Sequence, residues 1–250
     1  MQRVVTIQRQ DPAARLWRGD AVDGHLVGLL DPASFEADRY RTLRHLVERR
    51  QSSARTIGVS SAAAGDGKTT TALNLAAVLA EAPGANVVVV DLDLRTPSVG
   101  ERLGLPPEGP GFVDLLLDPG LTPADVVWRH PAVPLSAVPA GRSVATPYEL
   151  LRSPRLLDLL HELRQAYDYV IVDTPPVAPV PDARLIAEAV DGLVVVVAAH
   201  RTPRSLLEEA LNALDPARVI GLVFNGDDGA TTRYYGRYYH RHGGRGRDRR

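Results

Sequence analysis

The chain has 250 residues, with 29 basic and 30 acidic side chains and a formal net charge of −1. That length suits a single α/β domain, and 44% hydrophobic residues are enough for a sizeable core. The sequence has no cysteine, which excludes disulfides, thiolate metal sites and cysteine nucleophiles, and it has neither a membrane-length apolar run nor a secretory signal, so we expect a cytoplasmic protein.

The predicted elements alternate between strands and helices. Continuous apolar runs, typical of strands buried on both faces of a parallel sheet, occur at 56–61, 86–91, 168–173, 192–198 and 218–224. Helices are expected between them at 68–82, 153–166, 182–190 and 203–214. This alternation predicts an α/β fold with a doubly wound, mainly parallel sheet flanked by helices.

The remaining segments are less regular. Residues 97–150 are rich in Pro and Gly, with short helix candidates at 111–117 and 123–128, and we expect them to form an insertion around the active face. Residues 1–30 are predicted to be a flexible N-terminal arm, and 31–228 the folded domain. Residues 229–250 hold seven Arg, four Tyr and one Asp, a net charge of +6 that leaves −7 on the rest, and their composition predicts a disordered tail.

A phosphate-binding loop follows the first predicted strand. Residues 62–69 read Ala-Ala-Ala-Gly-Asp-Gly-Lys-Thr, which matches a P-loop with alanine in place of its first glycine. The two glycines allow a tight turn whose N–H groups point at a phosphate, and the next helix adds its positive end. Lys68, the one lysine of the sequence, is expected to reach the β- and γ-phosphates. The predicted nucleotide-binding residues are Ala64, Gly65, Asp66, Gly67, Lys68, Thr69 and Thr70.

Acidic residues end two other predicted strands. Asp91 and Asp93 follow the valines of 87–90, and Asp173 follows the run at 170–172. In an open parallel sheet the carboxyl ends of the strands meet at the ligand-binding edge, where the P-loop also lies. Carboxylates at that edge hold Mg²⁺ or accept a proton from a nucleophile, whereas isolated aspartates at strand ends are more often helix caps.

Three motifs in this order resemble those of the bacterial tyrosine kinases of capsule and exopolysaccharide systems. They are the P-loop with an acidic residue before Gly-Lys, the D-x-D of VVVVDLDLRTP and the D-x-P-P of VIVDTPP, called Walker A′ and Walker B in that family. Ala63 stands where partition and cell-division ATPases carry a second lysine. Two flanking features agree with the resemblance, which covers about residues 30 to 240. They are an E-x-x-R-x-x-R-like motif at Asp38, Arg41 and Arg44 and a C-terminal cluster of Tyr234, Tyr235, Tyr238 and Tyr239.

The resemblance implies an ATP-dependent protein-tyrosine kinase with Mg²⁺ as its metal. The expected catalytic residues are Lys68, Asp91, Asp93 and Asp173. Thr69, Asp93 and Asp173 are expected to hold the metal, and Asp91 to orient or deprotonate the incoming tyrosine hydroxyl. The tyrosine cluster is the expected phosphoacceptor, modified in trans within a ring of identical chains.

The resemblance also implies partners. The family's kinases act with a membrane-spanning activator, and since no span is predicted here we expect a separate chain of the polysaccharide co-polymerase type. That activator would hold the kinase at the inner face of the cell membrane. The expected oligomer interface is Asp38, Arg41 and Arg44, for which a solvated charged helix face is the alternative. A cognate tyrosine phosphatase is a further expected partner, and nucleic acid is not.

Other interpretations stay open from the sequence alone. Asn225 stands where related folds place an adenine-reading asparagine, and a turn-forming asparagine before glycine is an equally good interpretation. A P-loop ATPase that acts as a spatial switch without kinase activity is the main alternative function. The Arg-, Gly- and Tyr-rich tail is also typical of segments that bind nucleic acid or acidic membranes, which leaves the P-loop unexplained.

Overall fold

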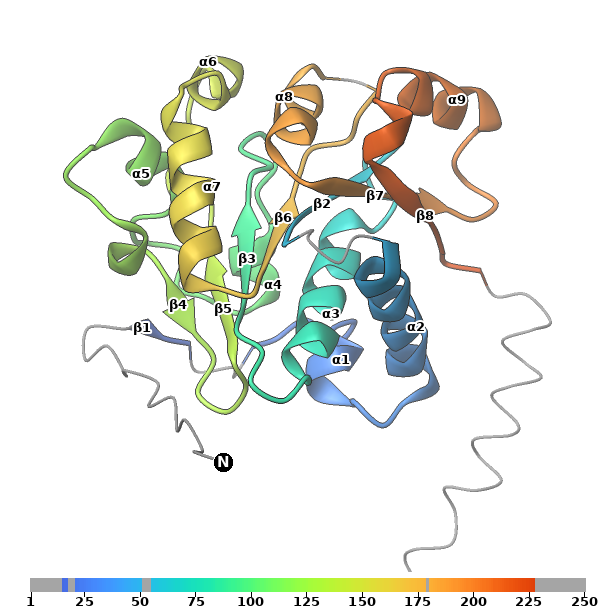
Figure 1. Ribbon diagram of the computed structural model, residues 1–250, viewed down its shortest axis with the longest axis horizontal. Helices are drawn as coiled ribbons and strands as arrows, with labels where there is room; N and C mark the ends of the chain where they lie inside the picture. Colours follow the sequence, from blue (N-terminus) through green and yellow to red (C-terminus); the bar gives the residue numbers. More distant parts are fainter. Residues whose placement is uncertain (1–14, 18–20, 51–54, 179, 228–250) are drawn as a thin grey trace, which may run out of the picture.

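An eight-stranded sheet lies between two layers of helices in the computed structural model, which describes residues 15–17, 21–50, 55–178 and 180–227 (Figure 1). The strand order is β1-β4-β5-β3-β6-β2-β7-β8; β4 runs antiparallel to β5, and the other neighbouring pairs are parallel. The strands are Arg15–Leu16 (β1), Thr56–Ser61 (β2), Val87–Asp91 (β3), Trp128–Arg129 (β4), Leu135–Val138 (β5), Tyr169–Asp173 (β6), Gly192–Ala198 (β7) and Val219–Asn225 (β8).

The helices of the described residues divide between the two faces of the sheet. They are Val27–Leu30 (α1), Phe35–Arg50 (α2), Lys68–Ala80 (α3), Val99–Arg102 (α4), Phe112–Leu117 (α5), Pro147–Leu151 (α6), Arg155–Ala166 (α7), Asp182–Ala189 (α8) and Arg204–Asn212 (α9), with 3₁₀ turns at Pro123–Asp125 and Pro216–Arg218. Helices α5 to α9 contribute to one core and α1 to α4 to the other. None of these helices is both long and apolar enough to cross a membrane.

The valine runs explain why the central strands are buried on both sides. Side chains alternate along a strand, so in β3 Val88 and Val90 enter one core while Val87 and Val89 enter the other. All five residues of β3 and all seven of β7 are buried. Such strands lack the polar alternation of a half-exposed sheet and form where helices cover both faces.

Helix α3 is enclosed by its neighbours. All of its residues except Thr70 are buried, and α1 and α2 pack over it on the side away from the sheet. The side chain of Asn74 accepts a hydrogen bond from the N–H of Gly28, 2.8 Å away, which attaches α1 to α3. The helix that follows the P-loop is thus fixed on all sides.

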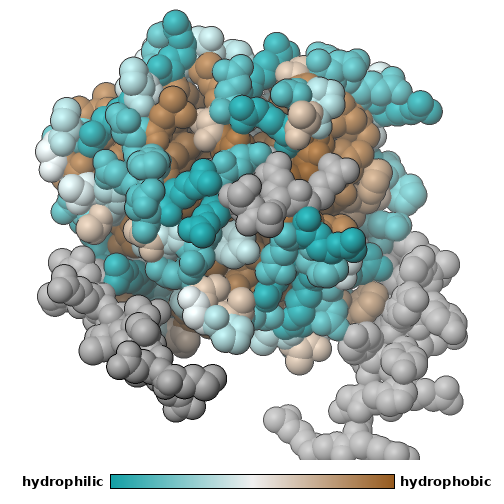
Figure 2. Space-filling view, viewed as in Figure 1, coloured by the Kyte–Doolittle hydropathy of each residue, from teal (hydrophilic) through white to brown (hydrophobic). Residues whose placement is uncertain are grey.

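Figure 2 shows hydrophilic side chains over much of the surface in the same view, with hydrophobic ones between them.

The doubly wound, mainly parallel α/β sheet predicted from the sequence is confirmed. All five predicted strands are present, and the four long helical segments are present with ends shifted by a few residues. The helix predicted at 123–128 is wrong, because a 3₁₀ turn at Pro123–Asp125 is followed by two buried valines and then by β4. The stretch 97–150 also adds β5 to the sheet beside β3, so it is more than an insertion.

The division into arm, domain and tail stays a prediction. Within the predicted arm, Trp17 and Leu26 are buried, and β1 pairs with β4. These described residues pack on the domain because they are apolar and meet a sheet edge and α3. The predicted tail at 229–250, with its four tyrosines, lies outside the described residues.

Candidate active site

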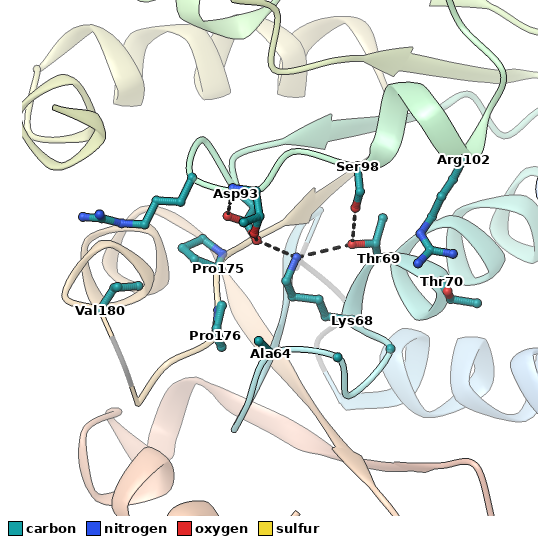
Figure 3. Close-up of a pocket in the computed structure, with 14 residues that line it drawn as sticks. Ala64, Lys68, Thr69, Thr70, Asp93, Ser98, Arg102, Pro175, Pro176 and Val180 are labelled. Carbon is teal, nitrogen blue, oxygen red and sulfur yellow. Dashed lines mark hydrogen bonds and ion pairs between the residues drawn. The ribbon is translucent and has the colours of Figure 1, made fainter. Parts of the chain in front are cut away.

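A cavity of about 370 Å³ opens at the carboxyl ends of the central strands (Figure 3). Three segments line it: the P-loop and start of α3, a stretch between residues 93 and 102 after β3, and Pro175, Pro176 and Val180 after β6. β2, β3 and β6 are neighbours in the sheet, so their following loops meet at this edge. The lining residues are Ala64, Gly65, Gly67, Lys68, Thr69, Thr70, Asp93, Arg95, Thr96, Ser98, Arg102, Pro175, Pro176 and Val180.

The P-loop turns through two glycines with positive φ, +81° at Gly65 and +96° at Gly67. A Cβ on Gly67 would lie 2.0 Å from Nδ2 of Asn225, which donates a hydrogen bond to the carbonyl oxygen of Asp66 at 2.9 Å. Glycine at 67 is therefore needed both for the backbone angle and for the close approach of Asn225. The predicted adenine-reading residue lies against the P-loop in this structure, and its role toward adenine stays a prediction.

Lys68 lies among three buried carboxylates. Its Nζ is 2.8 Å from Oδ2 of Asp93 (Figure 3). The same Nζ is 3.5 Å from Oδ2 of Asp173. Burial alone would lower the pKa of Lys68, but the charges of Asp173 and Asp93 outweigh it and raise the pKa above its usual value. The lysine is therefore a charged ammonium, positioned by carboxylates at the mouth of the phosphate loop.

Thr69 and Asp173 provide the oxygen donors that Mg²⁺ prefers. The Thr69 hydroxyl donates to Oδ2 of Asp173 at 2.6 Å, while Oδ1 of Asp173 is buried and has no hydrogen-bond partner among the described residues. An orphaned carboxylate oxygen beside a threonine hydroxyl fits a cation. Across the described residues no group of three or more His, Asp or Glu side chains is arranged as a metal site.

Asp91 is buried beside the cavity without lining it. Its Oδ2 accepts from the N–H groups of Ser98 and Val99 at 3.0 and 2.9 Å, and its Oδ1 from that of Asp93 at 3.2 Å. Burial and the charge of Asp173 raise its pKa. This geometry fits a residue that shapes the loop after β3, and the predicted role of Asp91 toward the tyrosine hydroxyl stays a prediction.

Several contacts of the site were not predicted from the sequence. The Ser98 hydroxyl donates to Oγ1 of Thr69 at 3.0 Å. Arg95 follows the D-x-D, where the sequence allows either a phosphate contact or a cap of the strand end, and it forms an ion pair of 2.7 Å with Asp182 at the start of α8. Thr202, whose place before Pro203 is typical of a helix cap, instead donates its hydroxyl to Oδ1 of Asp66 at 2.8 Å. No local sequence signal marks these contacts, because each joins segments far apart in the chain.

The predicted oligomer residues lie on α2, outside the lining of the cavity. Arg41 forms ion pairs with Asp38 at 2.7 Å and with Glu81 after α3 at 2.6 Å. Arg44 pairs with Glu48 and donates to the carbonyl of Val78 at 2.8 Å. Both arginines thus connect α2 to the end of α3 within the chain, and a role between chains stays a prediction.

Fold and site together define a P-loop nucleotide-binding protein. Residues 52–227 match the ParA family, described as NUBPL iron-transfer P-loop NTPase. The chain is 32% identical over 232 residues to the tyrosine-protein kinase YwqD of Bacillus subtilis, covering 90% of this chain and 96% of YwqD. It is 34% identical to the succinoglycan biosynthesis transport protein ExoP of Rhizobium meliloti, over 71% of this chain and 23% of ExoP.

Solved structures agree with these relatives. The chimerical protein CapA2B2 aligns with a TM-score of 0.75 at 27% identity, over 81% of this chain and 91% of that one. The kinase domain of the Escherichia coli tyrosine kinase ETK aligns with a TM-score of 0.74 at 25% identity, over 80% and 79%. The chain belongs to the bacterial tyrosine kinases, a family of P-loop NTPases. The alternative of a switch ATPase without kinase activity is not favoured.

Proposed function

We propose that this chain is an ATP-dependent protein-tyrosine kinase that phosphorylates its own C-terminal tyrosines and acts in exopolysaccharide or capsule synthesis. The observation that carries the proposal is the cavity at the P-loop, where Lys68, Thr69 and Asp93 face one space and Asp173 lies directly behind Thr69. Relatives named as tyrosine-protein kinases, and one named for succinoglycan biosynthesis, support the assignment of reaction and process.

The P-loop backbone and Lys68 would bind the phosphates of ATP. Thr69, Asp173 and Asp93 would hold Mg²⁺, which when bound neutralises charge on the β- and γ-phosphates. Lys68 would then exchange part of its contact with Asp93, now 2.8 Å away, for the γ-phosphate. The ammonium is thus kept in place before nucleotide arrives, and little reorganisation is needed at the moment of reaction.

The transfer itself needs a positioned acceptor. The tyrosine oxygen bonds to the γ-phosphorus while the bond from that phosphorus to the β-bridging oxygen breaks, which releases ADP. The phenolic proton passes to a carboxylate. Asp93 lines the cavity whereas Asp91 does not, so we assign the proton to Asp93 and the shaping of the loop to Asp91.

The acceptor and the partners complete the proposal. Tyr234, Tyr235, Tyr238 and Tyr239 lie outside the described residues and follow β8 in the sequence. We assign phosphorylation in trans, within a ring of identical chains, to this cluster. A membrane-spanning activator of the co-polymerase type would bring the kinase to the inner face of the membrane, and a cognate phosphatase would reset it. ExoP, of which this chain matches 23%, supports coupling to a larger polysaccharide-export chain.

The test is incubation of the full chain with Mg·ATP, followed by site mapping by mass spectrometry. We expect phosphate on the tyrosine cluster of the wild type and none on Lys68→Met. A matched control is Arg142→Met, since Arg142 is a largely exposed cation outside the cavity lining that pairs with Asp114. Mixing Lys68→Met with active chain should label the inactive copy if transfer occurs in trans. An unlabelled wild type, with and without the activator's cytoplasmic segment, would refute the proposal.

A further inference from the structure

The charged side chains around the cavity include more carboxylates than cations, so they do not balance the negative charge of a bound nucleotide. The carboxylates of Asp91, Asp93 and Asp173 are fully buried, and Lys68 is the cation among them. A nucleoside triphosphate brings several more negative charges to the same place. Phosphate sites in proteins meet this demand with arginine as well as lysine, because the planar guanidinium binds two phosphate oxygens at once.

Among the described residues three arginines lie at the P-loop or the cavity, and two of them are already paired with carboxylates. Arg95 pairs with Asp182 at 2.7 Å, and Arg102 pairs with Asp23. The third, Arg201, follows β7 and is exposed; within the described ranges its side chain has no hydrogen-bond or ion-pair partner. Its Nη2 lies 3.8 Å from the position of a Cβ built on Gly65, a residue that lines the cavity.

The segment that carries Arg201 is held against the P-loop. The Thr202 hydroxyl accepts from the N–H of Ala198 at 3.1 Å and donates to Oδ1 of Asp66 at 2.8 Å. The other oxygen of Asp66 accepts from the N–H of Ala63 at 2.9 Å, so one buried carboxylate joins the two loops. The turn that leads from β7 to Arg201 contains His200 in the left-handed region, at φ +62°. The backbone of Arg201 is thereby fixed at the rim of the P-loop.

We propose that Arg201 is a further nucleotide-binding residue, whose guanidinium contacts the β- and γ-phosphates of ATP from the rim above Gly65. This inference rests on the proposed function, since it assigns a residue to the same nucleotide. P-loop enzymes with an arginine supplied by their own chain use it to neutralise charge on the transferring phosphate, which is the role that the geometry gives Arg201.

The experiment is calorimetric titration of the full chain with Mg²⁺ and the non-hydrolysable analogue AMP-PNP. Arg201→Ala should bind about tenfold to a hundredfold more weakly than wild type, the loss of a charge-assisted hydrogen bond. Arg201→Lys should fall between the two. The matched control is Arg204→Ala, three residues further on, which removes an exposed arginine paired with Glu208 and should bind like wild type. Thermal melts check that each variant is folded.

The outcomes separate the two proposals. If the wild type binds AMP-PNP and Arg201→Ala binds it as tightly as Arg204→Ala does, the role of Arg201 is overturned and the proposed function stands. If the wild type binds no nucleotide, both are overturned. The assignment is supported if affinity for AMP-PNP falls in Arg201→Ala, falls less in Arg201→Lys and is unchanged in Arg204→Ala.

Discussion

Replacing Asp173 with asparagine should stabilise the nucleotide-free protein while it abolishes the reaction. Asp173 is fully buried, and its Oδ1 has no partner in the part of the chain that the structure describes. Across the sheet it is in register with Asp91, a second buried carboxylate. Asparagine has nearly the same shape and keeps an oxygen that can accept from Thr69. It removes the charge that this site holds at a cost when no metal is bound.

The size of the effect follows from the pKa of Asp173. Burial, opposed by Lys68 and Thr69, raises that pKa from 3.8 to about 6. Because the folded value is the higher one, the acid stabilises the native state fully below about pH 4, and this contribution is lost as the pH rises through about 6. At pH 8 the buried carboxylate costs up to about 3 kcal/mol. The variant also removes one of the two ion pairs of Lys68, so we expect a net increase of about 1–3 kcal/mol in the free energy of unfolding at pH 8.

Calorimetric melts at pH 8 and pH 4.5 test this reasoning. At pH 8 the melting temperature of Asp173→Asn should rise by about 2–10 °C, and at pH 4.5 the rise should nearly vanish. Glu162→Gln, which neutralises an exposed acid on α7, is the control and should change neither melt. A variant that melts below wild type at pH 8, or gains equally at both pH values, would refute the argument. Phosphorylation by Asp173→Asn should be absent at either pH.

Three further substitutions test the geometry of the site and its support. Gly67→Ala should lose nucleotide binding and melt well below Gly84→Ala. Both glycines have a positive φ, but the added Cβ at 67 lies 2.0 Å from Asn225 while that at 84 meets open space. Equal melting temperatures would contradict this. Arg44→Ala should lower the free energy of unfolding in urea by about 1 kcal/mol, because it removes the hydrogen bond to the carbonyl of Val78 near the end of α3. An unchanged urea midpoint would contradict a stabilising role of this hydrogen bond. Asp93→Asn should lower kcat at least about a hundredfold and should also lower stability, because it removes the buried carboxylate 2.8 Å from Lys68. Steady-state assays that find wild-type kcat would remove Asp93 from the proton transfer.

The sequence predicts the centre of the fold better than its margins. Runs such as VVVVD and GLVVVVA are buried on both faces, and only a covered parallel sheet provides that environment. β5 is equally buried but has only four residues, one of them Ser136, and lies between Pro134 and Pro139, so its pattern resembles a loop. β1 and β4 have two residues each, too few for any periodicity.

The residues of the site likewise fall into those that local sequence patterns predict and those that only the tertiary structure brings together. The P-loop spacing and the acidic strand ends are local patterns, and the structure brings Lys68, Thr69, Asp93 and Asp173 together as expected. The contact of Thr202 with Asp66 spans 136 residues and depends on β7 lying beside β2, which no short window of sequence contains. The locking of Asp91 by backbone N–H groups likewise depends on how the chain returns after β3.

The enclosure of α3 has a consequence for genetics. A helix buried at every residue but Thr70 tolerates few substitutions, since a larger or polar side chain there displaces sheet and helices alike. In a screen scored by phosphorylation, damaging changes along α3 would be as frequent as changes in the P-loop that precedes it. Scored by protein abundance, the two groups would separate, with variants at residues 71–80 of α3 depleted from cells and Lys68 variants retained. Measuring both quantities for the same library would divide the residues that build this kinase from those that perform its chemistry.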